Sequence, residues 1–288
     1  MSFAAAIRTY GRMVRFSHSL FALPFALAGA AFAAAGRGVT AWQLFWIVVA
    51  MVGARNAAMG FNRLADHRLD AANPRTAGRE LPRGALTRGA VWAFVIALSA
   101  VFVIASAMLN PLCLALSPAA LAIIFLYSYT KRFTWATQFF LGVSLAIAPV
   151  GGWLAVRGEF GAVPLVLAGA VLAWVAGFDI IYACQDVEFD RGAGLRSVPQ
   201  RFGVPRALWI ARGLHVLTVF LLASVAGLMN LHAAYLVGVA LVGGCLALEH
   251  SLVRPGDLSR VNLAFFTANG AVSILYLVAA LAGIALRP

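Results

Sequence analysis

The sequence predicts an all-α membrane protein that crosses the bilayer nine times and forms a single domain over residues 1–288. Composition is the first observation: 62% of the residues are hydrophobic and 11% are charged, against about 45–50% and about 25% in a soluble domain. The second is a series of apolar runs close to the roughly 20 residues that a helix needs to span a bilayer. Because no run alternates with a period of two residues, we expect helices rather than barrel strands to satisfy the backbone in lipid.

Nine such runs follow one another and predict the helices in order. They cover residues 17–35, 41–62, 90–108, 112–129, 136–156, 162–182, 207–228, 231–249 and 262–285. The first run follows basic residues without a convincing cleavage site, so we expect it to remain as a transmembrane helix. The three cysteines are spread over apolar runs with no CxxC pattern, which indicates small buried residues and no disulfide framework.

The Lys and Arg residues predict the orientation. With nine spans, all but Arg37, Arg157 and Arg287 fall on one side of the membrane, and basic loop residues accumulate on the cytoplasmic side. We therefore expect an integral protein of the bacterial inner membrane, with the N-terminus in the cytoplasm and the C-terminus on the opposite side. The same distribution accounts for the net charge of +12, so the charge does not indicate nucleic-acid binding.

Two acidic motifs end the second and sixth runs with one spacing. In each motif, three polar residues are four positions apart, which places them on one stripe of a helix. They are Asn62, Asp66 and Asp70 in "GFNRLADHRLD", and Tyr182, Asp186 and Asp190 in "DIIYACQDVEFDR". The first residue of the second stretch, Asp179, shares its stripe. Corresponding positions are 120 residues apart, which predicts a repeat of four helices with a ninth appended.

Solvated helix ends that pair with arginine are one interpretation of these acids. It is disfavoured because carboxylates at a helix C-terminus face the negative end of the helix dipole and repel one another unless cations bind. Oxygen ligands without His or Cys suit Mg²⁺, which commonly joins carboxylates to substrate phosphates. Arg75, Arg79 and Arg196 follow the motifs in loops, where they can hold phosphate oxygens. The pattern therefore predicts a magnesium–diphosphate site for a diphosphate with a lipid tail.

The stretches "NRLADHRLD", "NPRTAGRELPRG" and "YACQDVEFD" resemble the UbiA superfamily of intramembrane aromatic prenyltransferases, over essentially the whole chain. With "HSLFALPFAL" in the first run, they are similar to its quinone-biosynthesis branch, the 4-hydroxybenzoate polyprenyltransferase-like enzymes. The resemblance implies Mg²⁺-dependent transfer of a polyprenyl group from polyprenyl diphosphate to a small aromatic acceptor. Two acceptors remain open: 4-hydroxybenzoate, leading to ubiquinone, and 1,4-dihydroxy-6-naphthoate, leading to menaquinone. One departure is Arg63, because many members carry Asp after the first Asn.

The resemblance also implies roles for the matching residues. One Mg²⁺ would be held by Asn62, Asp66 and Asp70, and a second by Asp186 and Asp190. The diphosphate would be contacted by Arg75, Arg79 and Lys131. Aromatic faces stabilise cations, and the candidates for an allylic cation are Tyr127, Tyr129, Phe178 and Tyr182.

Arg55 and Asp179 complete the expected site. Arg55 lies inside an apolar run, where a charge is costly and is usually functional. The resemblance implies that it binds the carboxylate of the acceptor, and an ion pair with a nearby Asp is the alternative. Asp179 is a candidate for taking the proton that leaves the acceptor. Elsewhere, we expect Glu249 to be a helix-end charge and His215, His232 and His250 to be peripheral.

Two other functions stay open on the residues alone. A family member could use a non-quinone acceptor such as a haem or chlorophyll precursor. A cation or proton transporter would also carry internal repeats and membrane acids. Transporters place their sites near the middle of the bilayer, commonly at broken helices, whereas these acids end helices and precede Arg-rich loops.

Overall fold

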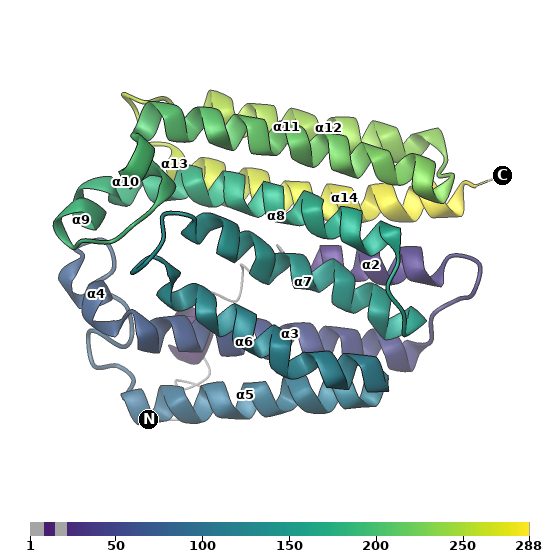
Figure 1. The fold of residues 1–288 in the computed structure, drawn as a ribbon, viewed down its shortest axis with the longest axis horizontal. Coiled ribbons are helices and arrows are strands. Elements are labelled where there is room, and N and C mark those ends of the chain that lie inside the picture. Colours follow the sequence, from purple (N-terminus) through teal and green to yellow (C-terminus); the bar gives the residue numbers. More distant parts are fainter. Residues whose placement is uncertain (1–8, 15–21, 288) are drawn as a thin grey trace.

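The fold is described from a computed structural model, which covers residues 9–14 and 22–287. In these residues the regular elements are helical, apart from one isolated bridge between Arg254 and Asp257. The long helices run side by side along the longest axis of the molecule (Figure 1). Three short helices lie together at one end, shown on the left of Figure 1: α4 (His67–Ala72), α9 (Val187–Gly192) and α10 (Val198–Phe202).

Seven helices in the described part of the chain are long and apolar enough to cross a bilayer. They are α3 (Ala41–Ala65), α5 (Arg88–Leu109), α6 (Pro111–Thr130), α7 (Thr137–Arg157), α8 (Ala162–Ala183), α11 (Val204–Met229) and α12 (Ala233–Ser251). Two apolar helices are shorter, α2 (Leu23–Ala34) and α14 (Asn269–Ala285). The expected all-α membrane class is confirmed. The count of nine spans stays a prediction, because the first run begins at residue 17 and residues 15–21 lie outside the described residues.

Local sequence explains where the helices begin. Thr40 starts α3 with a capping box, in which its hydroxyl accepts from the backbone N–H of Gln43 and the Gln43 side chain accepts from the backbone N–H of Thr40. Asn110 ends α5 and caps α6, whose first residue is Pro111, a residue suited to the first helical turn. This single shared residue explains why α5 and α6 turn back on each other so tightly.

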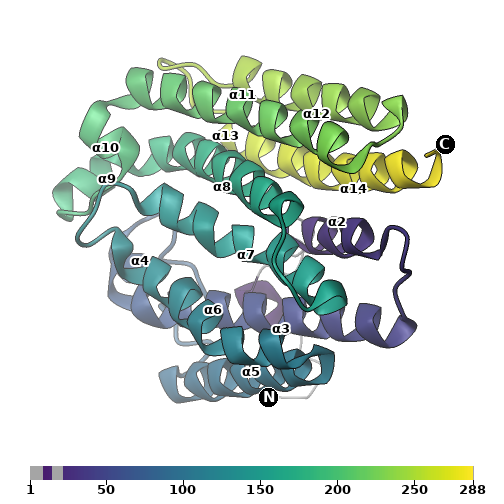
Figure 2. The same ribbon diagram turned by 45° about the vertical axis from the view of Figure 1, so that its right-hand side comes forward.

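Close helix contacts hold the bundle together at small residues. A Cβ added at Gly152 of α7 would lie 1.9 Å from the carbonyl oxygen of Ala26 in α2, and one at Gly29 would lie 2.2 Å from the carbonyl oxygen of Pro149. Helices in lipid associate through such close backbone approaches, because lipid tails provide no hydrophobic driving force. Figure 2 shows α2 and α7 in the middle of the bundle, between α3 on one side and α14 on the other.

Each acidic motif straddles a break in its helix. Helix α3 ends at Ala65, and Asp66 separates it from α4 with φ −95° and ψ 5°. Helix α8 ends at Ala183, and Asp186 precedes α9 with φ −104° and ψ 4° after a short 3₁₀ turn. The expectation that each motif lies on one uninterrupted helix is therefore wrong. The break falls at the same position of both motifs, 120 residues apart, while the four-helix repeat itself stays a prediction.

Candidate active site

The two acidic motifs are joined by Arg75, in the loop after α4. Its Nε and Nη2 atoms donate to the two carboxylate oxygens of Asp186 at 2.9 and 2.5 Å, and its Nη1 donates to the Tyr182 hydroxyl at 2.9 Å. The Asn73 amide also donates to Asp186, at 3.3 Å. Burial lowers the pKa of Arg75, but Asp186 and Tyr182 raise it more, so the net shift is upward. The loop after the first motif thus makes direct contact with the second motif.

Asp66 is buried between two cations from the segment after α6. Lys131 Nζ lies 2.6 Å from one carboxylate oxygen and Arg132 Nη2 lies 3.1 Å from the other. The Asn62 amide donates to Asp66 at 3.2 Å, so the expected pair of ligands does lie together. Arg132 is a site residue that the sequence analysis missed, although its place beside Lys131 in "TKRF" was a signal.

Asp70 is buried beside two arginines. Its Oδ1 atom accepts from Arg79 at 2.6 Å, and its Oδ2 atom lies 4.0 Å from Arg63 Nη1 and has no hydrogen-bond partner. Arg63 is itself 4% exposed and donates twice to the carbonyl oxygen of Met13 at 3.3 Å. Arg63, where the chain departs from the family pattern, is therefore a buried cation near Asp70, and the spacing of Asn62, Asp66 and Asp70 is unchanged by it.

Asp190 of the second motif and Arg196, which follows the motif, contact other parts of the site. Asp190 accepts from the Ser197 hydroxyl at 3.1 Å, and no ion pair joins it to the cations described above. The Arg196 guanidinium donates to the carbonyl oxygen of Phe133 at 2.7 Å, and the Arg196 backbone N–H donates to the carbonyl oxygen of Lys131 at 2.8 Å. Arg196 thus fastens two loops of the site together, a role not foreseen from its position after the motif.

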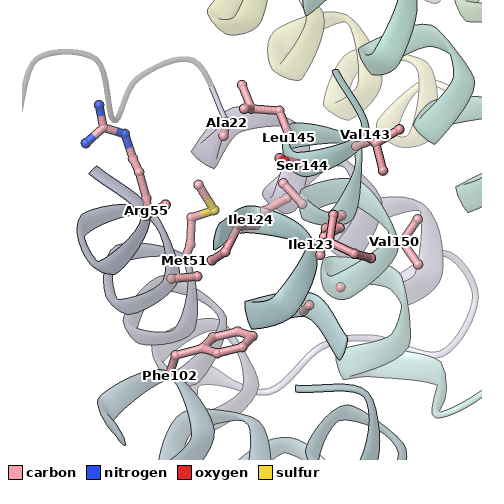
Figure 3. Close-up of a pocket in the computed structure, with 18 of the residues that line it drawn as sticks. Ala22, Met51, Arg55, Phe102, Ile123, Ile124, Val143, Ser144, Leu145 and Val150 are labelled. Carbon is pink, nitrogen blue, oxygen red and sulfur yellow. The ribbon is translucent and has the colours of Figure 1, made fainter. Parts of the chain in front are cut away.

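An apolar cavity of about 630 Å³ begins beside this charged cluster. Asn62, Arg79, Asp179 and Tyr182 line its charged end. The rest of its wall is largely Ala, Leu, Ile and Val from α3, α6 and α7, including the Ile123, Val143 and Val150 side chains in Figure 3. The cavity can therefore shelter a long hydrocarbon chain whose polar end remains among the acids and bases.

Arg55 lies on the wall of this cavity. Its Nη1 atom donates to the carbonyl oxygen of Val14 at 3.2 Å. In Figure 3, Arg55 lies on the left and Val143 and Val150 lie on the right, with the other labelled lining residues between them. Of the expected aromatic residues, Tyr127, Phe178 and Tyr182 line the cavity. Tyr129 does not: it is 43% exposed and lies under the guanidinium of Arg132 at 5.0 Å.

The donor atoms of the site suit a hard cation, although each acid is held by a basic or hydroxyl partner. In the residues that the structure describes, no three His, Cys, Asp or Glu side chains are close enough together to hold a metal ion. The ligand candidates supply carboxylate and amide oxygens, which Mg²⁺ prefers. The Oδ2 atom of buried Asp70 lies 4.0 Å from Arg63 Nη1 but has no hydrogen-bond partner, so it is a buried acceptor that a bound cation would satisfy. The residues present therefore fit Mg²⁺ chemically.

Fold and site together define a polytopic helical membrane protein with a charged cluster beside an apolar cavity. Residues 22–271 match the model of the UbiA prenyltransferase family. The chain therefore belongs to the UbiA prenyltransferase family and is a prenyltransferase. The transporter interpretation is set aside on this finding.

Individual relatives agree with this assignment. The 4-hydroxybenzoate octaprenyltransferase of Xanthomonas campestris pv. campestris (strain B100) is 31% identical over 256 residues, which cover 88% of this chain and 84% of that protein. The apo structure of a UbiA homologue from Aeropyrum pernix K1 is 34% identical, has a TM-score of 0.83, and covers 92% of this chain and 96% of its own. A UbiA homologue from Archaeoglobus fulgidus bound to DMAPP and Mg²⁺ shares the fold, with a TM-score of 0.75 at 23% identity over 96% of this chain and 99% of its own.

Proposed function

We propose that this chain transfers a polyprenyl group from polyprenyl diphosphate to 4-hydroxybenzoate, as a step of ubiquinone biosynthesis. The observation that carries the proposal is the bidentate contact of Arg75 with Asp186, which joins both acidic motifs at the charged end of the apolar cavity. The name of the Xanthomonas relative, a 4-hydroxybenzoate octaprenyltransferase, supports this acceptor over 1,4-dihydroxy-6-naphthoate.

The acids are proposed to be the metal ligands, as the family resemblance implies. Asn62, Asp66 and Asp70 would hold one Mg²⁺, and Asp186 and Asp190 a second. When bound, Mg²⁺ supplies positive charge that stabilises the diphosphate as it leaves. The basic residues that now pair with the acids, Lys131, Arg79 and Arg75, would then be free to donate to diphosphate oxygens. The ion pairs thus keep the site charge-balanced before the donor arrives.

The protein's own groups then favour transfer. The bond between the first prenyl carbon and the diphosphate oxygen breaks, and its electron pair leaves with the diphosphate. The faces of Phe178 and Tyr182 stabilise the allylic cation that develops, and the apolar cavity excludes water that would trap it. A ring carbon of the acceptor forms the new bond and loses its proton, which Asp179, a residue of the cavity lining, would accept.

Arg55 is proposed to orient the acceptor. Arg55 lines the cavity, and its guanidinium donates to the carbonyl oxygen of Val14. A guanidinium matches the two oxygens of a carboxylate, so the carboxylate of 4-hydroxybenzoate would bind here with its ring toward the donor. Both candidate acids carry this carboxylate, which is why Arg55 does not discriminate between them.

The end of the bundle that carries α4, α9 and α10 is proposed to face the cytoplasm. Most of the Arg residues of the chain lie in loops predicted for this side. The diphosphate site would then open to the cytoplasm of a bacterium, in the inner membrane, and the prenyl tail would extend into the bilayer.

A competition assay tests the proposed function. Purified protein in detergent receives Mg²⁺, geranyl diphosphate and equal amounts of 4-hydroxybenzoate and 1,4-dihydroxy-6-naphthoate, and products are identified by mass spectrometry. We expect prenylated 4-hydroxybenzoate, and none when EDTA is added. If only the naphthoate is prenylated, 1,4-dihydroxy-6-naphthoate and not 4-hydroxybenzoate is the acceptor. If the donor stays intact with both acids, the quinone-precursor proposal is overturned in favour of another acceptor such as a haem or chlorophyll precursor.

A further inference from the structure

A second group of buried polar side chains lies outside the diphosphate site, among α8, α12 and α14. Glu249, near the end of α12, is 0% exposed, as are Asn269 at the start of α14 and Trp174 in α8. The expectation that Glu249 is a helix-end charge is therefore wrong. Ionisable side chains buried in membrane helices are costly and usually serve function, so this carboxyl group requires an explanation.

Asn269 is the centre of the group. Its side-chain NH₂ donates to Glu249 Oε1 at 3.0 Å and to the carbonyl oxygen of Phe265 at 3.0 Å, and its own oxygen accepts from the Trp174 ring N–H at 2.7 Å. All of these groups are buried, where an unmade hydrogen bond costs about 1–3 kcal/mol. Glu249 and Trp174 thus fix the orientation of the Asn269 amide, and the amide in turn holds the Phe265 carbonyl.

Phe265 belongs to a stretch of π-helix, η3 (Ala264–Ala268), that directly precedes α14. Such turns are rare, occur frequently at functional sites, and change which side chains a helix presents. Here the ring of Phe265 lines the cavity together with Asp179. It lies 4.5 Å from the Tyr182 ring and meets the Phe178 ring edge to face at 5.2 Å, between ring centroids.

We propose that Glu249 is a positioning residue: by holding Asn269, and through it the Phe265 carbonyl, it sets the Phe265 ring beside Tyr182 and Phe178 as a third aromatic wall around the developing allylic cation. This role rests on the proposed prenyl transfer. It requires the acceptor oxygen of Glu249, because Oε1 alone makes the contact to Asn269. Oε2 makes no hydrogen bond and lies 3.9 Å from Nδ1 of His215, which is itself buried and within hydrogen-bond distance of His250.

A double-mutant cycle in the purified full-length protein tests the role, with kcat and KM for geranyl diphosphate and the melting temperature measured for each variant. Glu249→Gln keeps an acceptor oxygen and should retain the wild-type kcat. Glu249→Met and Phe265→Leu should each lower kcat about tenfold with little change in KM, because each weakens one cation–π contact. The double variant should be no slower than Phe265→Leu alone, since residues that act through one another are not additive.

The outcomes separate the claims. Effects of Glu249→Met and Phe265→Leu that multiply, or a folded Glu249→Met protein with the wild-type kcat, would overturn the positioning role. If Glu249→Met does not fold, Asn269→Ala, whose side chain has no donor for the Phe265 carbonyl oxygen, must give the same loss of kcat and the same non-additivity, or the role fails. If the wild-type protein forms no product, the proposed function is contradicted, and the role of Glu249, which rests on it, is contradicted as well.

Discussion

Arg75 and Asp186 form a two-point ion pair across the site, with N–O distances of 2.9 and 2.5 Å. Arg75 lies in the loop after α4 and Asp186 in the 3₁₀ turn after α8, so this contact joins segments that follow different membrane helices. We expect Arg75→Lys to raise KM for geranyl diphosphate about tenfold or more, because Lys makes a single point contact where Arg makes two. Steady-state kinetics would measure this, and an unchanged KM would count against a diphosphate role for Arg75.

Removal of single acids should abolish transfer while leaving insertion intact. Asp66→Ala and Asp190→Ala each remove one proposed metal ligand from a different motif, so we expect no detectable product from either membrane-inserted protein. The matched control is Glu188→Gln in the second motif, since Glu188 is exposed and pairs with Arg191 at the surface, a contact of little energetic value. Normal turnover in either Asp variant would contradict the two-motif site.

Arg55→Ala should weaken binding of the aromatic acceptor and leave binding of the prenyl diphosphate donor unchanged. Removal of a guanidinium that binds a carboxylate should raise KM for 4-hydroxybenzoate about tenfold or more, while KM for geranyl diphosphate stays near its wild-type value. Initial rates with each substrate varied in turn would separate the two constants. The acceptor assignment fails if the acceptor KM is unchanged or if both constants rise equally.

Gly151 in α7 offers a test of where the prenyl tail lies. It lines the cavity, and a Cβ added there would meet no heavy atom within 4 Å, so the backbone at this position has room for a side chain. Gly151 is about 15 Å along α7 from Leu141, a lining residue nearer the charged end. We expect Gly151→Leu to lower turnover of octaprenyl diphosphate more than that of geranyl diphosphate.

The control for this substitution is Gly244→Leu in α12. A Cβ there also meets nothing within 4 Å, but the residue is exposed and does not line the cavity. The ratio of the two turnover numbers should stay at the wild-type value in this variant. Equal losses with both donors in Gly151→Leu would show that the tail does not reach this part of α7.

Much of the fold could be predicted from the sequence because lipid imposes simple rules. Apolar run length predicted the long helices to within a few residues at most ends, as for the expected 162–182 and the observed Ala162–Ala183. The spacing of Asn62, Asp66 and Asp70 brought the right side chains to one cluster, although the helix breaks at Asp66. At that break, Asp66 contacts Lys131 and Arg132, which are distant in sequence and could not be paired with it from the local pattern.

Long-range contacts account for what the sequence did not indicate. Phe265 contacts the Tyr182 ring because the π-helix η3, which precedes α14, packs against α8. A π-helix has no clear sequence signal. Glu249 is near a helix end, which predicts exposure, yet the start of α14 covers it. Such burial is a property of the assembled bundle and not of the local pattern.

The most direct test of the account is calorimetric titration of the wild-type protein with geranyl thiodiphosphate, an analogue with a slowly cleaved bond, in the presence and absence of Mg²⁺. The central claim is that both acidic motifs form one magnesium-dependent diphosphate site. We predict tight binding with Mg²⁺ that is lost on addition of EDTA, and lost with Mg²⁺ present in both Asp66→Ala and Asp190→Ala. Binding that is equally strong without Mg²⁺, or that survives in either variant, would contradict the claim.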